Sequence, residues 1–287
     1  MPFLSVVIIT CNEEANIART LASVQPLVAD GKGEIIVLDS GSTDRTVAIA
    51  KSYGAKVFVE EWKGYAAQKN SAIDKATGDW ILSLDADEEV SPNLAAHIIR
   101  ATDHSSGPFE WNLAPKYDVR YDDLRTEVRP LPLAFFITRK NHFLGRWIQH
   151  GGFYPDRKLR LFARGAARFD ENRVVHEDAQ TNRRTAVVPT GCLLHHSYPT
   201  LADYLDHMNR YSSLGAEMLA AKGRVRFSAF NIVVRPTATF IYNYFFRLGF
   251  LDGREGLLLH LYHAAYVSWK YAKAWELSRA RRSTPPS

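Results

Sequence analysis

The first third of the chain alternates short apolar runs with helical patterns, and this alternation restricts the fold more than any other feature. Four short apolar runs read as strands: 4–10, 34–38, 56–59 and 80–84. The run 4–10 is continuous and β-branched, and it and 34–38 read as buried parallel strands. Three helical patterns lie between them, over 12–24, 46–53 and 65–76. Such alternation predicts a parallel sheet with right-handed crossovers, that is, an α/β fold.

Polar clusters follow three of these strands, at residues 10–13, 39–44 and 85–88. Ligands of open α/β sheets bind just beyond the carboxyl ends of the strands, so these clusters form the candidate site. Asp85 and Asp87 lie close enough to hold a hard divalent ion, which in turn would neutralise a diphosphate. Asp39 fits either a hydrogen bond to a nucleoside or a turn, and Asn12 fits a helix N-cap.

The loops contain neither a phosphate-binding P-loop nor the glycine fingerprint of dinucleotide-binding folds. We therefore expect a nucleotide to be bound by carboxylates and a metal rather than by a glycine cradle.

Four segments of the first third carry a specific pattern: LSVVIITCNEE (4–14), DSGSTD (39–44), QKN (68–70) and GDWILSLDADE (78–88). Together they resemble a family 2 glycosyltransferase with the GT-A fold. Further segments resemble the subgroup that adds sugars to the inner core of lipopolysaccharide: WKGY (62–65), YPD (154–156), RLF (160–162), VHE (175–177) and GFLDGR (249–254). Cys11 departs from the family, which commonly has Lys or another polar residue there.

The resemblance implies a Rossmann-like, mostly parallel sheet sandwiched by helices, with a helical, membrane-associating extension at the C-terminal end. It implies a UDP-sugar donor and Mg²⁺ or Mn²⁺ as cofactor. The residues carried over to the donor site are Thr10, Asn12, Glu13, Asp39, Ser42, Lys69, Asp85 and Ala86. Asp87 would bind the metal. His195 follows an apolar run that reads as a strand over 186–194, and it is a candidate second ligand, although a buried structural histidine is the more common outcome for any one His.

An inverting transfer also needs a general base within reach of the acceptor hydroxyl. Glu177 is the candidate, because it follows a short apolar segment as the base of the family does, and Asp178 is the alternative. His176 could orient that carboxylate or simply pack.

A basic run spans residues 139–168, where eight Lys and Arg accompany one acid, Asp156. Arg binds phosphate through paired hydrogen bonds and aromatic rings stack on sugar faces, so the run suits a phosphorylated glycan acceptor, although such runs are usually solvated surface. The candidate acceptor contacts are His150, Tyr154, Arg157, Arg160, Arg164 and His176. We expect no nucleic-acid partner, because no nucleic-acid-binding motif accompanies the run.

Charge is distributed unevenly along the chain. The net charge is −6 over residues 1–105, +3 over 106–220 and +8 over 221–287. We expect a catalytic domain over 1–220, with a donor half (1–105) and an acceptor half (106–220), and a helical tail over 221–287. The tail mixes aromatic, apolar and basic residues, which suits either an anionic membrane surface or packing on the core or a dimer contact.

The chain has no apolar run long enough for a spanning helix, and Cys11 and Cys192 read as reduced core residues of a cytosolic protein. The sequence therefore predicts a cytoplasmic enzyme, peripheral on the inner face of the plasma membrane, with an oligomer possible. It would move a hexose, with glucose as the leading candidate, to a lipid-linked glycan such as lipopolysaccharide core. The alternatives are transfer to a polyprenyl phosphate and a catalytically inactive nucleotide-sugar-binding protein.

Overall fold

The structure is a computed structural model that describes residues 3–102, 133–171, 178–223 and 225–283. The chain divides into two compact units. The first unit comprises Met1–Arg139 and Asp156–His195, and the second comprises Lys140–Pro155 and His196–Ser287. These bounds differ from the expected division at residue 220, because two strands run from one unit into the other. The functional division into a catalytic domain and a tail stays a prediction.

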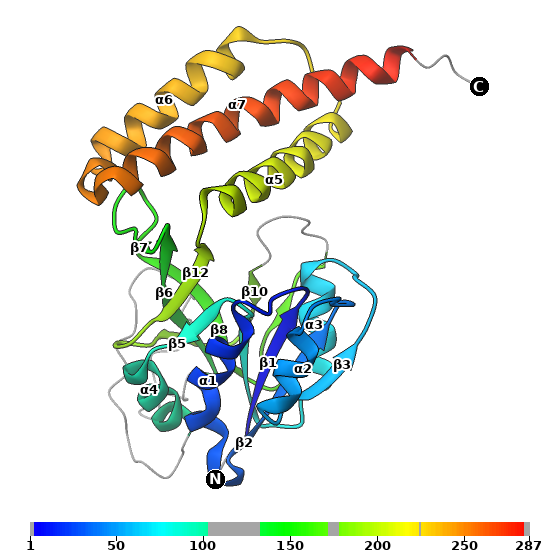
Figure 1. The fold of residues 1–287 in the computed structure, drawn as a ribbon, viewed down its shortest axis with the longest axis vertical. Helices are drawn as coiled ribbons and strands as arrows, with labels where there is room; N and C mark the ends of the chain where they lie inside the picture. The colour runs from blue at the N-terminus through cyan, green and yellow to red at the C-terminus, as the bar shows by residue number, and fades with distance from the viewer. Residues whose placement is uncertain (1–2, 103–132, 172–177, 224, 284–287) are drawn as a thin grey trace, which may run out of the picture. The chain divides into compact units, whose positions relative to one another are not determined.

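The parallel part of the main sheet belongs to the first unit (Figure 1). Its strands are β1 (Leu4–Thr10), β2 (Gly33–Asp39), β3 (Lys56–Val59) and β4 (Trp80–Asp85), in the order β3-β2-β1-β4. All three neighbouring pairs are parallel, and β1 is buried along its whole length. The four predicted strands are therefore confirmed to within one residue.

Helices cover both faces of this part of the sheet. The helices are α1 (Ile17–Val28), α2 (Thr46–Ser52), α3 (Tyr65–Asp74) and α4 (Pro92–Thr102). Val6 and Ile8 of β1 join the core cluster that contains α1 and α4, whereas Val7 and Ile9 join the cluster that contains α3. Alternate residues of one strand thus face opposite layers, and the predicted α/β class is confirmed.

The sheet continues beyond β4 with antiparallel pairs and one parallel pair, β11 on β6, so that it is mixed. The added strands are β5 (Glu88–Val90), β6 (Ala134–Phe143), β7 (Arg146–Trp147), β8 (Asp156–Ala163), β11 (Thr185–Val187) and β12 (Leu193–Tyr198). The full order is β3-β2-β1-β4-β8-β6-β12-β5, with β7 and β11 on β6. A separate pair joins β9 (Arg168–Phe169) to β10 (Ala179–Gln180).

Three local predictions are wrong. The expected strand 186–194 is two strands, because Pro189 and Gly191 (φ +85°) interrupt it, so His195 lies within β12. Asn12 is not a helix cap: it has φ +54°, and α1 begins only after Asn16. Cys11 is exposed rather than in the core, whereas Cys192 is buried as expected.

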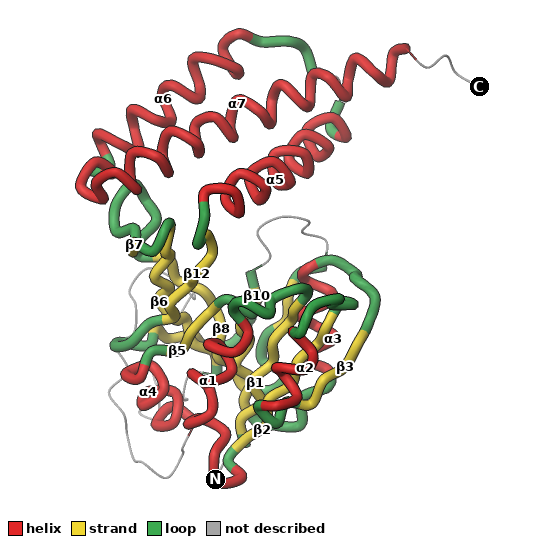
Figure 2. Tube along the Cα trace, in the orientation of Figure 1, coloured by secondary structure: helices red, strands yellow, loops and turns green. Residues whose placement is uncertain are grey.

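The second unit contains the helical C-terminal part of the chain (Figure 2). Helix α5 (Leu201–Ala221) begins at a capping box, in which the side chains of Thr200 and Asp203 each accept a backbone N–H of the other. A helical segment follows, made of the π-helical turn η3 (Phe230–Val234), α6 (Arg235–Ile241) and the π-helical turn η4 (Tyr242–Phe246). The short η5 (Gly249–Asp252) leads into α7 (Gly253–Ser283), against which both α5 and α6 pack.

The core of the second unit is a cluster around Phe143, Ile148, Tyr204 and Leu259. The predicted helical character of the tail is confirmed. In the part of the chain that the structure describes, no helix combines the length and the apolar character that crossing a membrane requires.

Candidate functional site

The loops after β1 and β2 hold each other in place at the carboxyl edge of the parallel strands. The backbone N–H of Asn12 donates to the Ser42 hydroxyl over 2.8 Å, and the Asn12 side-chain oxygen accepts from the Thr43 N–H over 2.9 Å. Thr46 accepts in the same way from the N–H of Glu13. The left-handed backbone at Asn12 turns the chain into these contacts, which an N-cap geometry would not allow.

Asp39 ends β2 opposite Thr10 and is almost fully buried. One carboxylate oxygen accepts the N–H groups of Gly41 and Ser42, and the other accepts the Ser42 hydroxyl. Asp39 therefore organises its own turn, as the sequence allowed, and its contact with a nucleoside stays a prediction. The Thr10 hydroxyl is buried and lacks a hydrogen-bond partner among the described residues.

Glu13 connects this corner to the acidic end of β4. Burial raises the pKa of Glu13, the amide of Asn16 lowers it, and the charges of Asp87, Asp44 and Asp85 raise it further. The carboxylates predicted from separate strand ends thus lie near enough to repel one another. Such a cluster favours a cationic partner.

Asp85 is neutralised by two buried bases. Lys69 Nζ lies 2.8 Å from one carboxylate oxygen, and an Arg160 terminal nitrogen lies 2.5 Å from the other. Burial alone would raise the pKa of Asp85, but Arg160 and then Lys69 hold it well below its usual range. Asp85 is therefore an ionised group whose charge is already balanced.

Asp87 faces His195 instead of a permanent cation. The His195 Nε2 lies 3.2 Å from an Asp87 oxygen, and both side chains are mostly buried. Burial raises the pKa of Asp87, and the imidazole offsets this and brings it below the usual value. Between the two aspartates, the Ala86 carbonyl accepts a hydrogen bond from the Thr20 hydroxyl over 2.7 Å, which fixes the turn.

Asp87 and His195 have the donor atoms of a metal site but supply only two ligands. Among the described residues no group of three or more His, Cys, Asp and Glu side chains could hold an ion. The pair fits Mg²⁺ or Mn²⁺ bound jointly with a diphosphate, since Mg²⁺ commonly takes one or two protein ligands and completes its shell with phosphate oxygens and water.

Glu88 is a residue of the site that the sequence analysis missed. It is fully buried, its carboxylate accepts the N–H of Asp85 over 3.0 Å, and it lies 2.8 Å from Arg160 and 3.2 Å from Arg139. Arg139 in turn pairs with Asp156. The sequence does hold a signal for this network of charges. Asp156, Lys158 and Arg160 are alternate residues of β8, and alternate residues of a strand lie on the same face of the sheet.

The predicted base falls outside the described residues, as does His176. Its alternative, Asp178, is about half exposed and lies 3.0 Å from Lys158. Lys158 and Arg160 are two residues apart on β8, so Asp178 is tied to the strand that carries the partner of Asp85.

The predicted acceptor contacts do not form one group. Arg160 is buried against Asp85 and Glu88, and its contact with an acceptor phosphate stays a prediction. Arg164 is exposed but follows the end of β8 that pairs with the start of β4, at the opposite edge from Asp85, and its acceptor role stays a prediction. Arg157 is exposed on β8 and keeps its assignment as a prediction.

The other two described candidates, His150 and Tyr154, belong to the second unit. His150 donates its N–H to the buried Asp252 over 2.8 Å, and its ring lies 3.0 Å from the same carboxylate. Tyr154 packs edge-on against Trp147 and stays exposed.

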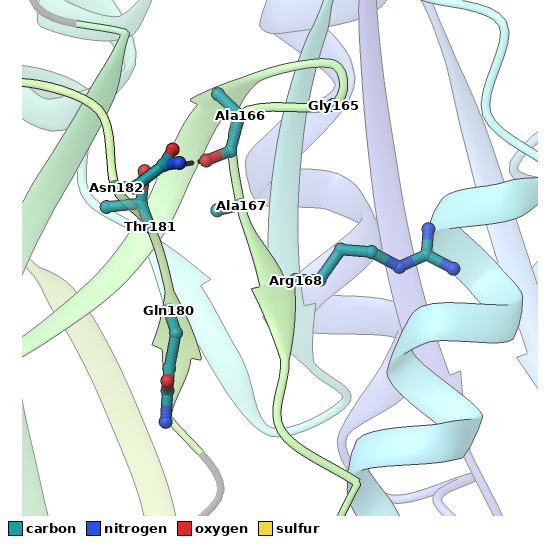
Figure 3. A pocket seen from close by; sticks show the side chains of 7 residues that line it. All are labelled: Gly165, Ala166, Ala167, Arg168, Gln180, Thr181 and Asn182. Atoms are coloured by element: carbon teal, nitrogen blue, oxygen red, sulfur yellow. Dashed lines mark hydrogen bonds between the residues drawn. The ribbon is translucent and has the colours of Figure 1, made fainter.

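A shallow hollow of about 410 Å³ lies elsewhere on the first unit (Figure 3). It is lined by Gly165, Ala166, Ala167, Arg168, Gln180, Thr181 and Asn182. Arg168 extends away from it to pair with Asp74 of α3. None of the predicted site residues lines this hollow, so it is not the candidate site.

Comparison with known proteins identifies the family of this chain. The profile of the family described as Glycosyl transferase family 2 matches residues 5–153. An uncharacterized glycosyltransferase of Rickettsia typhi is 31% identical, with 99% of this chain and 90% of the relative covered. The lipopolysaccharide core biosynthesis glycosyltransferase LpsC of Rhizobium meliloti is 28% identical, with 95% and 92% covered.

Among solved structures, a mannosyltransferase of Pyrobaculum calidifontis, in complex with GDP-Man and Mn²⁺, has a similar fold. It aligns over 96% of this chain and 88% of its own, with a TM-score of 0.53 and 16% identity. The predicted fold and the predicted enzyme class are both confirmed. The chain belongs to glycosyl transferase family 2 and is a glycosyltransferase.

Proposed function

We propose that this glycosyltransferase moves a hexose, with inversion, from a UDP-sugar to a lipid-linked phosphorylated glycan such as lipopolysaccharide core. Glucose is the leading donor sugar, and Mg²⁺ or Mn²⁺ is the metal. The observation that carries the proposal is the strand-end arrangement in which Asp85 is balanced by Lys69 and Arg160 while Asp87 is paired with His195.

This difference between the two aspartates supports different roles. Asp85 has its charge satisfied within the protein, so it suits hydrogen bonding to ribose or sugar hydroxyls. Asp87 and His195 can exchange their mutual contact for a divalent ion once a diphosphate brings further oxygen ligands. The bound ion would stabilise the negative charge that grows on the departing nucleoside diphosphate.

The residues of this chain would otherwise act by position and proton transfer. The interlocked loops carrying Asn12, Glu13 and Ser42 form a preorganised wall for the nucleoside. Glu177 is the proposed base that takes the proton of the acceptor hydroxyl. The link from Asp178 through Lys158 to the strand of Arg160 supports a base from this part of the chain.

The similarity to LpsC supports the lipid-linked acceptor. An acceptor of this kind resides in a membrane, so we propose that the enzyme works as a peripheral protein on the cytoplasmic face of the plasma membrane. The basic C-terminal part of the chain, with a net charge of +8 over residues 221–287, is consistent with an anionic leaflet.

The decisive experiment screens the protein against UDP-hexoses and GDP-mannose, with lipopolysaccharide core as acceptor, and measures both the released nucleotide and the glycan product. We expect transfer from UDP-glucose that is lost with EDTA and restored by Mn²⁺ or Mg²⁺. Asp87→Asn should lower metal-dependent transfer by about 100-fold or more, because the ion loses its carboxylate. Asp79→Asn, an exposed acid at the other end of β4, is the matched control.

Replacement of Glu177 by Gln separates this proposal from its alternatives. Loss of a general base should lower kcat by about 100- to 10,000-fold while UDP binding persists. A polyprenyl phosphate acceptor is already anionic, so full activity of Glu177→Gln with such a lipid would favour that alternative. Metal-dependent UDP binding without turnover on any acceptor would indicate an inactive binding protein.

A further inference from the structure

Exposed apolar side chains are concentrated in one stretch of the second unit. Of the twenty large hydrophobic residues that are exposed in the described part of the chain, thirteen lie between residues 227 and 261. Phe246 is 76% exposed and Phe230 is 62% exposed. Scattered exposed apolar residues need no explanation, but a contiguous group marks an interaction surface.

The exposed residues form a stripe along the helical segment 230–246. Phe230, Val233, Ile241 and Phe245 follow one another at spacings of three, eight and four, which places them on one side of the helix, and Tyr242 adjoins Ile241. We call this stripe, with Phe246, Leu248, Phe250 and Leu251 after it, the aromatic face.

The opposite side of the same segment is anchored within the second unit. Pro236 is buried, the Ser268 hydroxyl of α7 donates to the Ile232 carbonyl over 2.9 Å, and Arg235 bonds the Tyr271 hydroxyl. Contacts with α7 therefore fix the segment, and the aromatic face is what remains on the outside of this helix pair.

The charges around the aromatic face have one sign. No Asp or Glu occurs between Glu217 and Asp252, whereas this interval holds five Lys and Arg residues. Arg226, Arg235 and Arg247 are exposed. Aromatic and aliphatic groups flanked by Arg, without acids, match the boundary between anionic lipid headgroups and acyl chains.

The same charges argue against a second copy of the chain as the occupant. A two-fold contact brings identical patches together, so the arginines would meet with no acid of the patch to balance them. Asp252 and Glu255, the next acids along the chain, are already engaged by His150 and Arg146.

We infer that the aromatic face, within residues 230–251, inserts into the headgroup region of an anionic lipid leaflet. The inference deepens the proposed function, because it rests on an acceptor held in a membrane. It also limits the membrane contact to the segment before α7. Helix α5 and most of α7 then support this segment and do not insert.

The test is sedimentation of the full chain with vesicles of phosphatidylcholine, with and without about 30 mol% phosphatidylglycerol, at low and high salt. The test variant Val233→Glu/Ile241→Glu has a matched control, Val59→Glu/Ile99→Glu, in the first unit. The exposed fractions correspond, at 59% and 42% against 65% and 40%. We expect vesicle binding to fall by about tenfold or more in the test variant and by less than about twofold in the control.

A second measurement does not depend on these substitutions. A polarity-sensitive dye on Phe246→Cys, in a Cys11→Ser background, should shift to the blue with anionic vesicles and be quenched by spin-labelled lipid. The same dye on Val59→Cys should not respond.

Two results would overturn the inference. One is unchanged vesicle binding by Val233→Glu/Ile241→Glu. The other is sedimentation velocity that shows a dimer of the wild type and a monomer of this variant, since the face would then be covered by a second copy. Metal-dependent hydrolysis of UDP-sugar without lipid reports separately on the proposed function and should be equal in both variants, so the two ideas can fail independently.

Discussion

In the first unit the unusual side chains are buried ions, and in the second they are exposed aromatic and aliphatic groups. Glu88, Arg160 and Asp85 sit in or beside the core of an α/β sheet, while Phe230 and Phe246 face outward from a helix. Both cases reverse the usual partition between interior and surface. The buried ions are explained by the opposite charges beside them, and the exposed apolar groups by the lipid that we propose they contact.

The two reversals have different physical consequences. A buried ion stabilises only when its partners are present, so the strand-end network of the first unit is sensitive to any missing member. An exposed apolar group contributes little to the stability of the fold. The free energy of removing its surface from water is gained only when a partner covers it. The unusual residues of the first unit thus contribute to the stability of its fold, whereas those of the second unit do not.

The largest effect on stability is expected for Glu88→Ala. The change leaves Arg160 and Arg139 buried with one carboxylate fewer, which should lower the free energy of unfolding by about 3–5 kcal/mol. Urea unfolding measures this, and hydrogen exchange should locate the loss in the first unit.

The neighbouring Glu89→Gln is its matched control. Glu89 is only partly buried and lies 3.9 Å from Arg19, so its loss should cost less than about 1 kcal/mol. A cost for Glu88→Ala as small as that of the control would mean that the network does not hold the turn.

A second prediction concerns His260, a buried histidine of the second unit. His260 is 1% exposed, and neither ring nitrogen has a hydrogen-bond partner among the described residues. Burial, with a smaller effect of His263, lowers the pKa of His260 to about 4, although Asp252 opposes this. The unfolded chain therefore takes up the proton first, and stability falls as the pH drops from about 6.5 to about 4.

The loss should reach roughly 3 kcal/mol below pH 4, and His260→Leu should abolish most of it. Hydrogen exchange by mass spectrometry at pH 7 and pH 4.5 resolves the two units. An identical pH dependence in wild type and His260→Leu would contradict the assignment.

The parallel half of the fold was predictable because each of its strands is a short, largely apolar run that the local sequence identifies. The interlocked contacts of Asn12 with Ser42 and Thr43 were not predictable, since they join residues about thirty positions apart. The same holds for Arg160, which the sequence assigned to a phosphate although it lies among acids 72 and 75 positions away. Local patterns predict elements, whereas the pairing of charges depends on which strands become neighbours.

A smaller effect is expected for Glu34, the acid that anchors the other end of the parallel strands. Burial raises its pKa, but Lys56, Thr77 and Ser5 lower it to about 2. Its contribution is therefore complete above about pH 4.5 and is lost as the pH falls towards 2. Because Lys56 is 60% exposed, solvent screening limits the contribution to about 1–2 kcal/mol.

Comparison of Glu34→Gln with wild type between pH 5 and 2.5 measures this term. The wild type should lose its advantage only below about pH 4.5, after His260 has begun to destabilise the second unit. An advantage that disappears already at pH 6 would contradict the low pKa of Glu34.

The smallest effect on stability is expected where the aromatic face is most exposed. Phe246→Ser removes a large ring, yet the ring is 76% exposed, so the free energy of unfolding should change by less than about 0.5 kcal/mol. Leu259→Ala, in the core of the same unit, should cost about 2–5 kcal/mol. If Phe246→Ser destabilised the protein as strongly as Leu259→Ala, the ring would serve the fold, and the contrast between buried ions and displayed apolar groups would not hold.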